Sequence, residues 1–403
     1  MMRKDKKRFK VAMIGHKRVP SREGGIEVVV EELSVRMVER GLKVDVYNRK
    51  DRFGKAYKQP REYKGIRIIQ IPTFKVSALN AFVYSVLASF RALFGGYDCI
   101  HYHAEGPCAM MWLPKLFGIH TVATIHGLDW QRAKWGGFST KYLKLGEKCA
   151  SKYADELIVL SNNNQKYFKE TYGRDTHLIP NGIVKKNADY SAREISERFG
   201  LQKDGYILFL ARIVPEKGLH YLIEAFKTVE TNKKLVIAGD LTPGNEYVEK
   251  IKKMASEDER IILTGFVQGR LLDELFSNCY IYVLPSDIEG LAMSLLESVS
   301  YGVPCLVSDI PENMEVVGGY MPSFKHGDIQ DLSVKLDKIL KGEYSDIWKK
   351  ENFDGYDYIK NVIYGKIIQI KKGERKFFFE GCIKRRILSA VSTPRAYKTV
   401  SYT

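Results

Sequence analysis

The sequence predicts an α/β protein built from two doubly wound parallel sheets. Short apolar runs rich in β-branched residues alternate with longer segments of helical periodicity, and a polar stretch at 184–190 interrupts this alternation once. Runs that are apolar at consecutive positions are typical of strands buried on both faces. The chain has 403 residues, which is enough for two domains that each bury a core.

The expected elements follow one another in a regular order. We expect strands at 10–15, 43–47, 66–71, 99–102, 121–125, 156–160 and 177–179, and in the second half at 206–210, 234–238, 261–263, 280–284 and 304–307. One apolar stripe of helical spacing covers 26–38 and ends before Gly41, which suits a left-handed position after a helix. A second stripe covers 79–94 and is expected mainly to face the core, with an amphipathic membrane-docking face as the alternative.

The polar stretch sets the predicted domain boundary. We expect Rossmann-like domains at 1–184 and 185–345, then a helical segment at 346–372 that packs back across both domains, and a basic tail at 373–403. Two such domains facing each other across a cleft would bind a ligand at the carboxyl ends of their strands.

Composition argues against several classes of protein. The six cysteines are scattered without a C-x-x-C pair, so we expect neither a disulfide framework nor a zinc site. The basic first residues are not followed by an apolar signal region, and Asn80 and Arg91 interrupt the most apolar stretch, 76–94. We therefore expect a cytoplasmic protein without a membrane span.

The net charge of +16 suits nucleic acid, phosphorylated substrates or an anionic membrane as a partner. No nucleic-acid-binding motif accompanies it, so we expect no nucleic acid partner.

The strongest chemical signal is the segment 285–304, where an expected strand ends and an expected helix begins near Gly290. The free amides and the positive dipole end of such a helix suit a diphosphate. Glu289 stands just before the helix and Glu297 two turns along it. Two glutamates at this spacing are most often only solvated. Their companions in the sequence are what favour a site.

The first companion is a basic turn after the strand expected at 206–210. Arg212 and Lys217 stand at the carboxyl end of that strand, before a helix, and could neutralise a diphosphate. Taken alone, a solvated basic turn is slightly favoured.

Two further companions lie in the first half. Gly24 and Gly25 precede an expected helix, and paired glycines allow a close approach of backbone to ligand. They do not form G-x-G-x-x-G, so the nicotinamide fingerprint is absent. His126 stands where a buried strand opens into a loop, although a lone histidine is more often structural. His101 and His103, also at a strand end, are left without a role.

Together these motifs resemble the retaining glycosyltransferases of the GT-B fold, glycosyltransferase family four. The resemblance spans residues 9–340 and is carried by Gly24 and Gly25, His126 and Gly127, Pro180 to Gly182, Arg212 with Lys217 and Gly218, and Glu289 with Glu297. The segments 15–27 and 126–132 also resemble bacterial rhamnosyltransferases of capsule and surface-polysaccharide assembly. The resemblance implies an acceptor-side first domain and a second domain that binds the nucleotide sugar.

The resemblance also implies a role for each of these residues. Arg212 and Lys217 would bind the donor diphosphate, and Glu297 the nucleotide ribose. Glu289 would contact hydroxyls of the transferred sugar, helped by the backbone amides of Gly290 and Leu291. His126 would lie close to the reacting sugar, and the loop of Gly24 and Gly25 would close over donor and acceptor.

The implied reaction is displacement of a nucleoside diphosphate from an anomeric carbon by an acceptor hydroxyl, with retention. The first-choice donor is dTDP-rhamnose, and the acceptor is a saccharide or a lipid-diphosphate-linked saccharide. Basic side chains and helix amides would stabilise the leaving phosphate. No D-x-D motif occurs at the expected strand end, so neither a metal nor a cofactor beyond the co-substrate is expected. The resemblance suggests a front-face path in which the leaving phosphate accepts the acceptor's proton.

Two alternatives stay open at this point. One is a nucleotide-sugar epimerase of the same fold, and the other is a non-catalytic membrane-surface protein that binds nucleotide sugars. The basic residues near both ends of the sequence would be drawn to an anionic leaflet, so we expect peripheral association with the inner face of the cell membrane.

Overall fold

A computed structural model of the chain describes residues 8–51, 60–73, 77–131, 137–183, 190–318 and 320–344, and these form two compact units. The first unit holds the described residues up to Thr124 together with Leu145–Leu157. The second holds the described residues of Ile125–Lys144 and those from Ile158 onward. The predicted boundary at 184 and the segments predicted at 346–372 and 373–403 lie outside the described residues.

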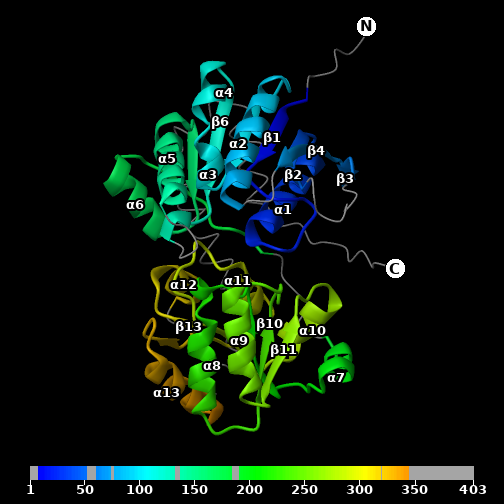
Figure 1. Ribbon diagram of the computed structural model, residues 1–403, viewed down its shortest axis with the longest axis vertical. Coiled ribbons are helices and arrows are strands. Elements are labelled where there is room, and N and C mark those ends of the chain that lie inside the picture. Colours follow the sequence, from blue (N-terminus) through cyan, green and yellow to red (C-terminus); the bar gives the residue numbers. More distant parts are fainter. Residues whose placement is uncertain are drawn as a thin grey trace. The chain divides into compact units, whose positions relative to one another are not determined.

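An eight-stranded sheet organises the first part of the chain (Figure 1). Its strands, in sheet order, are β3 (Glu62–Tyr63), β4 (Ile66–Thr73), β2 (Lys43–Asp51), β1 (Lys10–Ile14), β5 (Cys99–His103), β6 (His120–Ile125), β7 (Glu156–Val159) and β8 (His177–Leu178). Strand β3 runs antiparallel to β4, whereas β4, β2, β1, β5 and β6 are parallel neighbours. The accompanying helices are α1 (Gly25–Glu39), α2 (Ser77–Leu93), α3 (Glu105–Cys108), α4 (Trp112–Leu116), α5 (Phe138–Tyr153) and α6 (Asn162–Tyr172).

A six-stranded parallel sheet organises the rest of the second unit. Its strands, in sheet order, are β11 (Ile261–Gly265), β10 (Lys234–Ala238), β9 (Tyr206–Leu210), β12 (Ile281–Leu284), β13 (Cys305–Ser308) and β14 (Ser323–Phe324). The accompanying helices are α7 (Arg193–Phe199), α8 (Leu219–Lys227), α9 (Glu246–Ser256), α10 (Arg270–Asn278), α11 (Met293–Ser300), α12 (Pro311–Val317) and α13 (Ile329–Leu340). The strand order reverses between β9 and β12, and ligands bind at such switch points in open α/β sheets.

The doubly wound α/β prediction is confirmed. Every strand expected from the apolar runs is present, with ends shifted by a few residues at most except in β2, which extends to Asp51. Strands β3 and β14 were not predicted, because each has only two residues and no apolar run marks it.

Helix α2 differs from the expectation that its apolar stripe mainly faces the core. Its buried face carries Tyr84, Ala88 and Ala92, whereas Phe90 is 48% exposed. The Tyr84 hydroxyl explains this rotation, because it donates to the carbonyl of Tyr47 at 2.6 Å and accepts from the amide of Gly15 at 3.0 Å. A buried hydroxyl needs such partners, so this face must turn toward the sheet. Within the described ranges, no helix combines the length and apolar character required for a membrane crossing.

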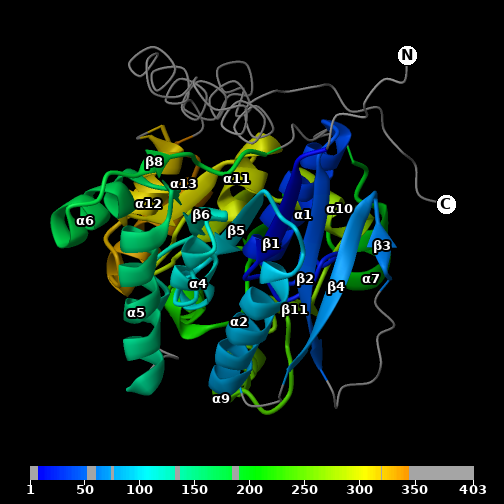
Figure 2. The ribbon, with the colours of Figure 1, turned by 90° about the horizontal axis from the view of Figure 1, so that it is seen from above.

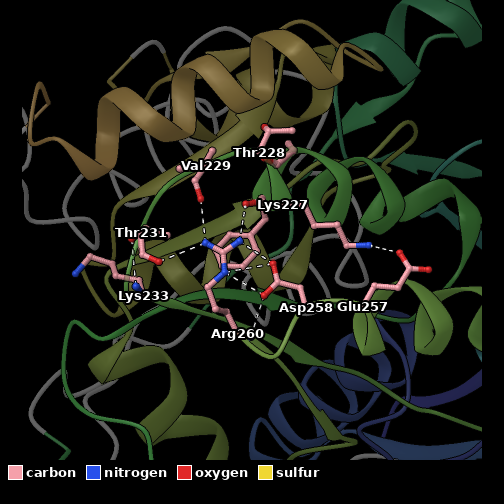
Figure 3. Close-up of polar contacts among 10 residues, drawn as sticks. Lys227, Thr228, Val229, Thr231, Lys233, Glu257, Asp258 and Arg260 are labelled. Atoms are coloured by element: carbon pink, nitrogen blue, oxygen red, sulfur yellow. Dashed lines mark hydrogen bonds and ion pairs between the residues drawn. The ribbon is translucent and has the colours of Figure 1, made fainter.

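A cluster around Arg260 ties the end of α8 to the turn before β11 (Figure 3). The guanidinium donates to the carbonyls of Val229 (2.9 Å), Thr231 (3.3 Å) and Phe226 (3.5 Å), and it lies 4.6 Å from the centre of the Phe226 ring. It also donates to both carboxylate oxygens of Asp258, at 3.0 and 2.7 Å. The carbonyls of Val229 and Thr231 belong to the segment that follows α8, so Arg260 fixes this segment against the turn before β11.

Replacing Arg260 with alanine is expected to lower the free energy of unfolding by about 2 kcal/mol, because it removes the guanidinium donors to the carbonyls of Val229 and Thr231 and the cation paired with Asp258. Denaturant unfolding measures this. The control is Lys227→Ala, which removes only the exposed ion pair with Glu257 and should cost about 0–1 kcal/mol. Equal losses in the two variants would contradict the anchoring role of Arg260.

The effect of Arg260→Ala should also depend on pH. The hydrogen bonds from Arg260 lower the pKa of Asp258. A carboxyl with a lowered folded pKa stabilises the fold above its unfolded pKa of about 4 and loses that contribution as the pH falls through the folded value. The stability difference between wild type and variant should therefore shrink below about pH 4.

Candidate functional site

Glu289 lies at the centre of a polar cluster in the loop that follows β12. Its side chain is 7% exposed and forms an ion pair with Lys217, whose side chain is 12% exposed. It also accepts a hydrogen bond of 2.7 Å from the hydroxyl of Ser286. A buried carboxylate requires a cation and hydrogen-bond donors, and both are present. Neighbouring strands supply the pair, since Lys217 follows β9 and Glu289 follows β12.

The loop after β9 packs tightly on the loop after β12. The amide of Asp287 donates to the carbonyl of Glu216 at 3.0 Å. Gly218 has φ +63°, and a Cβ placed on it would lie 1.9 Å from the carbonyl oxygen of Pro285. No residue with a side chain fits at that distance, so Gly218 allows the loop carrying Lys217 to reach Glu289. Arg212 lies in the same loop and is exposed.

Gly290 makes an even closer approach, to the loop that follows β6. A Cβ on Gly290 would lie 1.5 Å from the carbonyl oxygen of His126 and 2.9 Å from the Cα of Gly127. Gly127 has φ +148°, which favours glycine as well. Both loops belong to the second unit. The backbone of His126 is thus brought directly against the residue that follows Glu289.

Helix α11 begins at Met293, three residues after the expected start at Gly290. Gly290 and Leu291 therefore precede the helix, and Glu297 is half-buried on its second turn. Tyr282 anchors the helix, because its hydroxyl contacts the Ser294 hydroxyl at 2.8 Å and the Leu210 carbonyl at 3.2 Å. Burial raises the pKa of Tyr282 well above its usual value, so this hydroxyl keeps its proton.

Gly24 and Gly25 belong to the first unit, and α1 begins at Gly25. The carboxylate of Glu27 folds back over this start: it accepts from the amide of Lys17 at 2.9 Å, and a Cβ on Gly24 would lie 2.3 Å from its other oxygen. Gly24 is thus packed against a buried carboxylate. His101 and His103, which had no predicted role, are buried in the same unit and stack with ring centroids 4.2 Å apart.

The sequence did not indicate several polar residues of these loops. Ser286 is three residues before Glu289, and its place next to a strand end was an available signal. Asp287 pairs with His326 at 2.7 Å, and the amide of His326 donates to the carboxylate of Asp309 at 2.8 Å. No local pattern links residues 39 positions apart, so His326 could not be found from spacing. In the first unit, burial lowers the pKa of His16 to about 4, so this side chain after β1 is neutral.

The cluster can bind an anionic, hydroxyl-rich ligand. Lysine provides three N–H donors, so Lys217 can keep its contact with Glu289 and still donate to a second oxygen. Glu289 can accept from hydroxyl groups. Among the residues that the structure describes, no three His, Cys, Asp or Glu side chains are grouped so as to hold a metal ion.

Two family models match the chain in succession. Residues 23–186 match "Glycosyltransferase Family 4", and residues 191–354 match "Glycosyl transferases group 1". The predicted site residues all fall within these two ranges.

Curated relatives point to the same class. The chain is 26% identical over 286 residues to an Escherichia coli UDP-Gal:alpha-D-GlcNAc-diphosphoundecaprenol alpha-1,3-galactosyltransferase, covering 66% of this chain and 73% of that protein. It is 23% identical over 236 residues to the capsular polysaccharide biosynthesis glycosyltransferase CapM of Staphylococcus aureus. That match covers 55% of this chain and 61% of CapM, which is less than two thirds of its length.

A solved structure supports the fold. Sucrose-phosphate synthase from Thermosynechococcus elongatus superposes with a TM-score of 0.77 at 19% sequence identity, covering 93% of this chain and all of that one. At this identity the likeness concerns the fold alone.

Proposed function

Because the chain belongs to the glycosyltransferases of the GT-B fold, with a family 4 region followed by a group 1 region, we propose that it transfers a sugar from a nucleoside-diphosphate sugar to a saccharide acceptor in surface-polysaccharide assembly. An epimerase is not favoured, because both family models and the named relatives describe glycosyltransferases.

The observation that carries this proposal is the buried contact of Glu289 with Lys217 and Ser286, at the strand-order reversal between β9 and β12. A solvated surface carboxylate would need no such surroundings. A carboxylate fixed next to an ammonium group provides, in one place, an acceptor for sugar hydroxyls and a cation for a phosphate.

In the reaction we propose, the bond between the anomeric carbon and a diphosphate oxygen breaks, and a bond to the acceptor oxygen forms. Arg212 and Lys217 stabilise the negative charge that develops on the leaving diphosphate, together with the amides of Gly290 and Leu291. Glu297 binds the ribose of the nucleotide. These groups need no metal ion for charge neutralisation.

We further propose retention of configuration by a front-face path. The leaving phosphate accepts the proton of the acceptor hydroxyl on the face from which it departs. His126 lies next to the reacting sugar, and its backbone contact with Gly290 supports this placement. The loop of Gly24 and Gly25 closes over donor and acceptor.

The donor we propose first is dTDP-rhamnose, on the resemblance of segments 15–27 and 126–132 to rhamnosyltransferases. A UDP-sugar is the main competitor, because the name of the E. coli relative specifies UDP-Gal. That name also specifies a diphosphoundecaprenol, which supports a lipid-diphosphate-linked saccharide as acceptor. We therefore propose that the protein is cytoplasmic and associates peripherally with the inner face of the cell membrane. Such an acceptor and the charge of +16 both support this location.

The test is a thermal-shift screen with nucleoside diphosphates and nucleotide sugars. One nucleotide should raise the melting temperature selectively, because a ligand that binds only the folded state stabilises it. Arg212→Ala and Glu297→Ala should each weaken nucleotide binding by about tenfold or more. Lys253→Ala, on an exposed position of α9, serves as the control and should leave binding unchanged. Lack of stabilisation by any nucleotide at millimolar concentration would leave the proposal without support.

A further inference from the structure

Exposed aromatic and aliphatic side chains gather on two adjacent helices of the first unit. On and just after α2, Phe90 is 48% and Phe94 is 88% exposed. On and just after α4, Trp112 is 39%, Leu116 is 73% and Phe117 is 67% exposed. The two helices contact each other and lie side by side in both views (Figures 1 and 2). We call these five residues the apolar patch.

Large apolar side chains are rarely exposed together on the surface of a folded protein. Phe90 and Phe94 are four residues apart, as are Trp112 and Leu116, so each pair lies on one side of its helix. The buried side of α2 is already occupied by Tyr84, Ala88 and Ala92. The apolar patch is therefore additional to the core, and groups of this kind mark protein or membrane contacts.

The first unit also carries two exposed lysines on α5. Lys148 and Lys152 are four residues apart on the part of α5 that belongs to the first unit, and both are exposed; we call them the basic face. This basic face is joined to α4 at its C-terminal end, because Asp155 forms an ion pair with Lys115, the residue before Leu116. The C-terminal ends of α4 and α5 therefore lie close together, and Lys152 is three residues before Asp155.

We propose that the apolar patch and the basic face together dock the protein on an anionic lipid bilayer. Aromatic and aliphatic side chains enter the boundary between headgroups and acyl chains, while lysines contact anionic headgroups. Reversible membrane binding by a folded protein needs both kinds of contact, and the apolar patch, Lys148 and Lys152 all belong to the first unit. This docking surface would account for the peripheral membrane association proposed above, and it does not depend on which nucleotide sugar is the donor.

Charge argues against a second copy of the chain as the occupant. In a two-fold symmetric dimer the same surface meets itself, so the basic face would approach an identical pair of lysines. Like charges at such a distance are unfavourable. An anionic bilayer matches the charge of the lysines and also accepts the aromatic rings.

The experiment is co-sedimentation of the full chain with vesicles of phosphatidylcholine, with or without phosphatidylglycerol. Wild type should bind the vesicles that contain phosphatidylglycerol and bind phosphatidylcholine alone more weakly. Phe90→Ser/Phe94→Ser and Lys148→Glu/Lys152→Glu should each lower the partition coefficient by about tenfold or more. All four positions are exposed, so the variants should fold.

Matched controls lie on the second unit. Val334→Ser replaces an apolar residue that is 46% exposed, and Lys250→Glu/Lys253→Glu reverses two exposed lysines on α9. Both controls should bind vesicles as wild type does. All variants should keep the nucleotide-induced thermal shift of wild type, which separates failure of docking from failure of the proposed activity.

Three results would overturn the proposal. The first is no binding of wild type to either kind of vesicle. The second is equal binding by wild type and both patch variants. The third is a dimer in light scattering that Phe90→Ser/Phe94→Ser dissociates, which would assign the apolar patch to a contact between copies.

Discussion

Glu289→Gln is expected to lower kcat/KM for sugar transfer by about 100-fold or more, while the protein stays folded. Glutamine keeps the shape of the side chain but loses the negative charge that Lys217 neutralises. Lys217 then lacks its buried counter-ion, and a sugar hydroxyl meets an amide in place of a carboxylate. Initial rates with varied donor concentration measure the effect, and nucleotide affinity measured in parallel should change much less.

Ser286→Ala is the matched control for this change. It removes the 2.7 Å hydrogen bond to Glu289 but leaves the charge pair in place, so the loss of rate should stay below about tenfold. If Glu289→Gln transfers sugar at the wild-type rate, the assignment of Glu289 to the catalytic site is wrong.

Gly290→Ala should lower the rate of sugar transfer as much as Glu289→Gln does, for a steric reason. A methyl group at this position would lie 1.5 Å from the carbonyl oxygen of His126, so one of the two loops must move. Since misplacement by about 1 Å can cost about 100-fold in rate, we expect a loss of at least that size. The melting temperature should fall by several degrees at most, because the clash lies in loops outside the core.

Gly182→Ala provides the comparison, because a Cβ at Gly182 meets nothing within 4 Å and its φ is in the ordinary range. This variant should retain wild-type activity. Should Gly290→Ala do the same, the close packing of these loops would have no part in catalysis.

The fold was predictable because its strands are buried on both faces. Such strands need apolar residues at every position, and runs like Tyr206–Leu210 and Lys234–Ala238 show this directly in the sequence. The rotation of α2 was not predictable. Large apolar residues lie on several sides of that helix, and the hydrogen bonds of Tyr84 with Tyr47 and Gly15 decide which side faces the sheet.

The site was predictable in part for a similar reason. Lys217 and Glu289 each follow a strand, and parallel strands bring their carboxyl ends to one edge, so their meeting could be expected. The start of α11 at Met293 instead of Gly290 could not, because no side chain caps that helix end and marks it in the sequence. The pairing of Asp287 with His326 depends on how three separate loops fold over one edge of the sheet.

The bare backbone at Gly218 has a consequence for engineering new sugar specificities. Because its missing side chain lets two loops touch, random replacement at this codon would yield almost entirely inactive clones. A mutant library gains more from positions such as Leu291 and Met314, which are half-buried and carry ordinary side chains. Diversity in donor choice is best sought by varying such side chains and leaving Gly218 and Gly290 untouched.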